Sequence, residues 1–150
     1  MNTFFVSLEK ILIRDLDRLE NELKLYPTEE SIWRLKGDIK NSAGTLCLHL
    51  CGNLQHYIGV GLGKSDYVRN RENEFAARNI ERRVLLEEIS RTRDAVITAL
   101  RKSDPAILET DYPLQVFDYS MTVQFFMIHL AAHLEYHLGQ INYHRRLVAT

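Results

Sequence analysis

The chain has 150 residues, of which 45% are hydrophobic and 26% are charged. This length and composition indicate a single globular domain, residues 1–150, and argue against a disordered, collagen-like or membrane-spanning chain. Nineteen basic residues face twenty acidic ones, for a formal net charge of −1. A DNA-coating protein usually has a basic excess, so nucleic acid is not an expected partner.

The first predicted helix covers residues 3–25, where apolar residues such as Leu8, Leu12 and Leu16 recur at three- and four-residue steps. Tyr26-Pro27 ends it, because proline lacks the backbone N–H and restricts the residue before it. Residues 28–40 are predicted to form a connection with one aromatic anchor, Trp33.

The second predicted helix covers residues 41–60, with Asn41 or Ser42 as the N-cap. Three closely spaced glycines end it: Gly59, Gly61 and Gly63. Residues 65–79 are polar and of mixed charge, and we expect a connection anchored by Tyr67 and Phe75.

The third predicted helix covers residues 80–103 and stops at Asp104-Pro105, and the fourth covers residues 120–148. Between them, residues 106–118 contain Pro113 and are predicted to be partly extended. Four amphipathic helices bury their apolar faces best as an all-α four-helix bundle. The long connections leave the order of the helices around the bundle open.

Neither a signal peptide nor a transmembrane helix is expected. No basic region precedes the first short apolar stretch, and no run of about 18 apolar residues occurs. The two cysteines, Cys47 and Cys51, lie four apart in an apolar run and are predicted to be small buried side chains. Without a disulfide framework, we expect a reducing, cytoplasmic location.

The six histidines are concentrated on two of the predicted helices. His49 and His56 lie on the second, whereas the fourth carries four: His129, His133, His137 and His144. Residues i and i+4 share a helix face, so a histidine pair at this spacing can provide two metal ligands. An imidazole from another helix would complete a three-histidine site, and imidazole suits zinc, nickel, cobalt and iron. The alternative is a set of core-edge histidines bonded to carbonyls or tyrosines.

The sequence His133-Leu134-Glu135-Tyr136-His137 differs from the zinc-protease motif H-E-x-x-H. Glu135 is two positions from each histidine and therefore points about 200° away from either on a helix. It is not placed to act as the base of such a protease.

The segment from His129 to Ile141, HLAAHLEYHLGQI, resembles the closing helix of the DinB-like superfamily, which typically carries H-x3-H and then Gly-Gln. The helix around His49 resembles the second helix of that family. The resemblance implies a four-helix bundle with a divalent metal held by His49, His133 and His137. It leaves His129, His56 and His144 as neighbours of the site or bystanders.

Other residues are candidates for positions beside these ligands or for contacts with substrate. Gln140 is suited to bond a ring nitrogen, a ligand or bound water. Asn53 follows His49 by one turn. Tyr136 flanks the apolar stripe of the fourth predicted helix, although such tyrosines are more often packing residues. Gly139 is expected to let another helix approach closely.

Arginines are frequent after residue 68, at Arg69, Arg71, Arg78, Arg82 and Arg83, and glutamates alternate with them. We expect a solvated, salt-bridged face here. The alternative is a clamp for a carboxylate of a thiol or substrate.

The resemblance implies a metal-dependent enzyme, because members of the superfamily include transferases and isomerases that use low-molecular-weight bacterial thiols. The cofactors implied are a divalent transition metal (zinc, nickel, iron or manganese) and such a thiol, with a small molecule as substrate. Metal-activated water, giving hydrolysis, is the nearest competitor. The alternative function is a non-catalytic, stress-related homodimer with a structural metal or none. A homodimer is expected in either case.

Overall fold

The computed structural model describes residues 2–149, and four long helices account for most of them. These are α1 (Thr3–Leu25), α3 (Ala43–Leu54), α5 (Arg82–Lys102) and α6 (Val123–Val148). A π-helix, η1 (Gln55–Val60), continues α3, and η2 (Pro105–Ile107) is a 3₁₀ turn. The described residues contain no strand, only one isolated bridge between Asp111 and Thr122. The predicted all-α four-helix architecture is confirmed.

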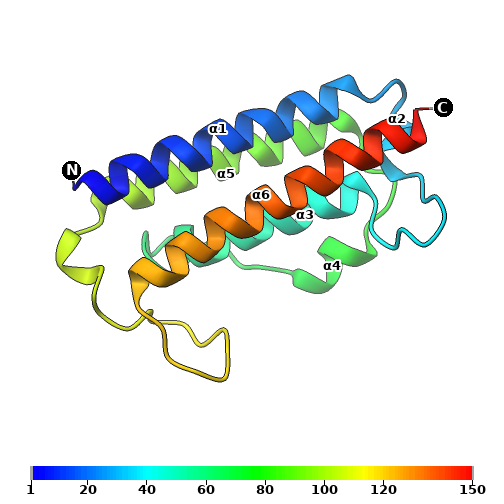
Figure 1. The fold of residues 1–150 in the computed structure, drawn as a ribbon. Coiled ribbons are helices and arrows are strands. Elements are labelled where there is room, and N and C mark those ends of the chain that lie inside the picture. The colour runs from blue at the N-terminus through cyan, green and yellow to red at the C-terminus, as the bar shows by residue number, and fades with distance from the viewer. Residues whose placement is uncertain (1, 150) are drawn as a thin grey trace.

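In the bundle, α1 packs against α5 and α6, and α3 packs against the same two helices, so α1 and α3 occupy diagonal corners (Figure 1). Ion pairs Glu9–Arg101 and Glu20–Arg93 show that α1 and α5 run antiparallel. A buried hydrogen bond from Gln55 of η1 to Thr92 joins the continuation of α3 to α5.

The direction of α3 explains one of the long connections. Gly59 lies beside Ala95 and Gly63 beside Ala99, so α3 and its π-helical extension run parallel to α5. Two parallel neighbours require a connection that returns along the bundle, and residues 61–81 make that return (Figure 1). This segment includes α4 (Arg71–Ala76), which packs against α3.

Both polar connections contain a short helix that periodicity did not predict. Residues 28–40 include α2 (Glu29–Trp33), which begins with a capping box between Thr28 and Ser31. The predicted anchor Trp33 is buried and its indole N–H donates to the carbonyl of Ile80. Helices of five or six residues are too short to show an apolar repeat, which is why α2 and α4 were expected to be loops.

The ends of the long helices agree with the sequence within a few residues, except in the second. Of the two N-cap candidates there, Ser42 is the cap and accepts from the Thr45 N–H. The α-helix ends at Leu54 and the chain continues as the π-helix, which the sequence pattern does not reveal. Cys47 and Cys51 are both buried free thiols, as predicted.

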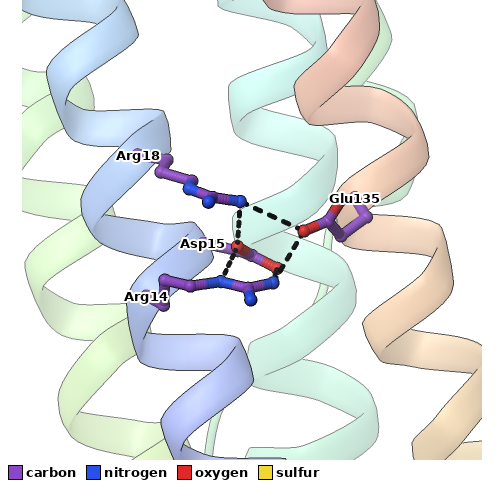
Figure 2. A network of polar contacts seen from close by, with 4 residues as sticks. All are labelled: Arg14, Asp15, Arg18 and Glu135. Atoms are coloured by element: carbon purple, nitrogen blue, oxygen red, sulfur yellow. Dashed lines mark hydrogen bonds and ion pairs between the residues drawn. The ribbon is translucent and has the colours of Figure 1, made fainter.

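A buried carboxylate fixes the rotation of α6 against α1 (Figure 2). Asp15 is fully buried, and its carboxylate accepts hydrogen bonds from Arg14 and Arg18. Both arginines also donate to the Glu135 carboxylate of α6. Glu135 therefore points toward α1, away from its neighbours His133 and His137 in the sequence, as the helical spacing predicts. Among residues 2–149, no helix combines the length and apolarity needed to cross a membrane.

Candidate metal centre

Three histidines meet where α3 crosses the middle of α6. His49 comes from α3, and His133 and His137 come from consecutive turns of α6. One ring nitrogen from each lies within 4.8 Å of the others, and Nε2 of His49 is 3.3 Å from Nε2 of His133. The structure thus brings together the three residues that the sequence singled out as metal ligands.

The rings are arranged around a common point and are not stacked on one another. The His49 ring is nearly perpendicular to those of His133 and His137, at 76° and 90°. The rings of His133 and His137 are 87° apart with centroids separated by 4.6 Å.

The donor set fits a divalent transition metal. Tetrahedral nitrogen ligands at 2.0–2.1 Å from zinc lie about 3.3 Å apart, the separation seen between His49 and His133. Nδ1 of His49 lies 3.2 Å from the Glu74 carboxylate, and Nδ1 of His137 lies 2.6 Å from Oε1 of Gln140. Both partners are acceptors, so these Nδ1 atoms carry the protons and each Nε2 keeps a lone pair for a metal.

The site also keeps His133 and His137 in the neutral form that binds metal. Burial, together with repulsion from the neighbouring histidines when they are charged, lowers the pKa of His133 to about 4. Burial also lowers the pKa of His137. At neutral pH these two rings are therefore unprotonated, and a metal need not displace protons from them.

Two residues that the sequence did not identify as part of the site hold His49 in place. Glu74 of α4 is 5% exposed and binds Arg69 through two contacts of 2.9 Å, from Nε and from Nη2. Burial alone would raise the pKa of Glu74, but the hydrogen bonds from His49 and Arg69 lower it overall. The carboxylate is therefore ionised and accepts from His49.

Arg69 corrects the prediction that this arginine-rich stretch is a solvated face. Its side chain is only 9% exposed, whereas Arg71, Arg78 and Arg83 are exposed at the surface as expected. Arg82 is half-buried and donates to the carbonyl of Tyr26. The carboxylate that Arg69 binds is that of Glu74 in the same chain, and not that of a thiol or substrate. In the sequence, the aromatic anchors Tyr67 and Phe75 were the signal that part of this segment packs inward.

Gly52 leaves room for the Glu74 side chain beside α3. A Cβ atom added at Gly52 would collide with the Glu74 carboxylate. The glycine therefore lets α4 bring its glutamate against α3, one turn after His49.

The remaining predicted neighbours lie at different distances from the cluster. Gln140 bonds His137, as proposed. The His129 ring lies 6.2 Å from that of His133 and stacks on Phe126. Tyr136 packs edge-on against His137 but is 64% exposed. Asn53 is buried, and its Oδ1 has no hydrogen-bond partner among the described residues.

Gly139 does not have the predicted role within the fold. A Cβ atom there would meet nothing within 4 Å, so no helix among residues 2–149 packs in contact with it. Its neighbour Gln140 instead lines a cavity of about 350 Å³ between residues 38–41 and α6. The cavity is bordered by Lys40, Leu46 and Tyr143. Gln140 thus links this cavity to His137.

His56 and His144 stand apart from the cluster. His56 packs on Tyr57, while His144 is buried at the far end of α6. Nε2 of His144 donates to the carbonyl of Arg34, and Nδ1 accepts from the Tyr26 hydroxyl, both at 2.7 Å. His144 is therefore a structural residue that ties α6 to the segment after α1.

We expect His144→Gln to destabilise the protein at pH 7.5 by about 1–2 kcal/mol through lost buried hydrogen bonds. Burial lowers the pKa of His144 in the folded state, so its stabilising contribution is complete above the unfolded pKa of about 6.5 and falls at lower pH. The gap between parent and variant should therefore narrow from pH 7.5 to pH 5 in urea unfolding. A gap that widens on acidification contradicts this assignment.

A comparison with protein families identifies the family of the chain. A model of the DinB superfamily matches residues 11–141, which include every residue of the histidine cluster. Searches of curated proteins and of solved structures found no match. Because the matched region spans most of the chain, the protein belongs to the DinB superfamily.

Proposed function

We propose that this protein is a metal-dependent enzyme in which His49, His133 and His137 hold one divalent transition metal: zinc, nickel, iron or manganese. The carrying observation is the convergence of three ring nitrogens, with two of the rings anchored through their other nitrogen by Glu74 and Gln140. A hydrogen-bond acceptor behind the ring nitrogen that does not face the metal is typical of metal-bound histidines.

A divalent metal in this site would supply positive charge that lowers the pKa of a thiol or water reaching it. The three neutral ligands leave that charge undiminished, and the nearby Glu74 carboxylate is already neutralised by Arg69. The protein's own contribution is to hold the ligands, with Gln140 at the edge of a cavity that could receive a small molecule.

The reaction we propose is attack by a low-molecular-weight thiol on an electrophilic small molecule, an S-transfer or isomerisation. In the S-transfer, the sulfur forms a bond to carbon, the bond from that carbon to the leaving group breaks, and the thiol proton passes to solvent. In the isomerisation, the thiolate adds to one carbon of a carbon–carbon double bond and is released again after rotation about that bond. Lys40 in the cavity beside Gln140 is suited to a carboxylate of the thiol. His129 and Tyr136 flank the ligands on α6 and are our candidates for contacts with substrate. The buried free thiols Cys47 and Cys51 support a cytoplasmic location.

The test begins with metal content. Tag-free protein offered zinc, nickel, iron and manganese should retain about one equivalent after desalting. A protein that retains none of these metals contradicts the proposal.

Thiol chemistry is the next measurement. L-cysteine and an activated aryl halide should react faster with loaded protein than with chelator-treated protein. Faster hydrolysis of an activated ester without thiol transfer would favour activated water. Stoichiometric metal without either reaction would favour the non-catalytic bundle with a structural metal.

A further inference from the structure

One of the three clustered histidines lacks the partner that the other two have. Glu74 and Gln140 bond the Nδ1 atoms of His49 and His137. Nδ1 of His133 is buried and has no hydrogen-bond partner among residues 2–149. A metal held by Nε2 of His133 leaves the ring proton on this Nδ1, because a neutral imidazole carries one proton. The site therefore contains a buried donor that needs an acceptor.

An acceptor that needs a donor lies on the facing helix. Asn53 of α3 is 7% exposed, and its Oδ1 is a buried atom without a partner among the described residues. The other buried polar side chains of α3 are bonded, Thr45 to Ser42 and His49 to Glu74. An unpaired buried amide is costly, and an apolar side chain would fill the position without that cost. The asparagine at this position therefore calls for a polar partner.

The packing of α3 on α6 sets Asn53 and His133 at neighbouring levels of the bundle. His49 contacts His133, and two turns later along the same helical run Tyr57 of η1 contacts Phe126. The two helices are therefore antiparallel. Asn53 lies midway between His49 and Tyr57, so it is opposite the turn of α6 that precedes His133.

The direction of the two side chains brings them closer still. Helical side chains tilt toward the N-terminus of their own helix. In this antiparallel pair, Asn53 leans along α3 toward the level of His133, and His133 leans along α6 toward the level of Asn53. We propose that Oδ1 of Asn53 accepts a hydrogen bond from Nδ1–H of His133 when Nε2 of that ring holds the metal. The inference rests on the proposed metal site and makes Asn53 a positioning residue for the third ligand.

The first measurement is zinc affinity, by competition with a chelator of known affinity. Asn53→Leu keeps the branched shape of the side chain but removes the acceptor, and it should weaken zinc binding by about 10- to 100-fold. Asn53→Ala, which cannot overpack the interface, should weaken zinc binding in the same way. Asn53→Asp keeps an acceptor in place and should bind zinc at least as tightly as the parent. Circular dichroism of each metal-free variant checks the fold.

Thr45→Val is the matched control on α3. Thr45 is buried one turn before His49 and is bonded to Ser42, so this variant should lose stability but keep the zinc affinity of the parent. Variants of Asn53 that behave like this control, with lower stability and unchanged affinity, would overturn the positioning role while leaving the metal site intact. A parent that binds no zinc would instead overturn the metal site itself, and this inference with it.

The hydrogen bond itself is tested by nuclear magnetic resonance of protein with isotope-labelled histidine. In the zinc-loaded parent, His133 should bind through Nε2 and show a slowly exchanging Nδ1–H proton. In zinc-loaded Asn53→Leu this resonance should move upfield, whereas that of His137, which Gln140 holds, should stay in place. Binding of zinc through Nδ1 of His133, or a His133 proton that Asn53→Leu leaves unchanged, would overturn the proposal.

Discussion

Replacing both α6 ligands, His133→Ala/His137→Ala, is expected to abolish binding of the metal while the bundle stays folded. One imidazole cannot hold a divalent transition metal against water as three do, because two of the three protein ligands are lost. The α6 helix should tolerate the change, since alanine is the best helix former and both rings lie outside the hydrophobic core. The measurement is metal content after desalting, with circular dichroism to confirm the fold.

The matched control is His129→Ala, one turn earlier on the same face of α6. Its ring stacks on Phe126 and is not part of the cluster, so this variant should keep about one metal equivalent. Equal loss of metal in the control would mean that His129 belongs to the ligand set. A double variant that still retains one equivalent would place the metal elsewhere.

Glu74→Gln is expected to weaken metal binding by about 10- to 100-fold, the usual effect of losing a partner behind a metal-bound histidine. The glutamine keeps the shape and an acceptor oxygen but loses the charge that holds the Nδ1 proton of His49. It also leaves the buried Arg69 without its ion-pair partner, so we expect some loss of stability as well. Competition for zinc with a chelator of known affinity measures the first effect.

Two further variants distinguish positioning of His49 from general destabilisation. Glu72→Gln changes an exposed residue of the same helix and should alter neither property. Gly52→Ala should mimic Glu74→Gln, because its Cβ displaces the carboxylate without removing it. If Glu74→Gln lowers stability but leaves zinc affinity unchanged, the Arg69–Glu74 pair serves only to fasten α4 to the bundle.

The four long helices were predictable because each buries a stripe long enough to repeat several times. Leu12, Leu16 and Leu19 mark α1, because steps of four and of three residues fall on one face together only in a helix. The helix ends at Tyr26-Pro27 because proline lacks the backbone N–H. The α6 histidines were predictable for a similar reason, since a spacing of four sets His133 beside His137 regardless of the rest of the fold.

Other features depend on which helices become neighbours, and no local pattern records that. His49 reaches the α6 pair because α3 packs against α6, and the sequence left the order of the bundle open. Arg69 and Glu74 reach His49 because the connection to a parallel α5 must return along α3, which turns a polar segment into part of the site.

By itself, the sequence determined the helices, the shared face of His133 and His137 and the resemblance to the DinB superfamily, because these follow from spacing along one chain. Only the tertiary structure decided that His144 is a structural clamp, that Gly139 faces open space and that Glu74 is buried behind His49. Each of these depends on whether a segment distant in sequence packs against the residue. The burial of a polar group is determined in the same way.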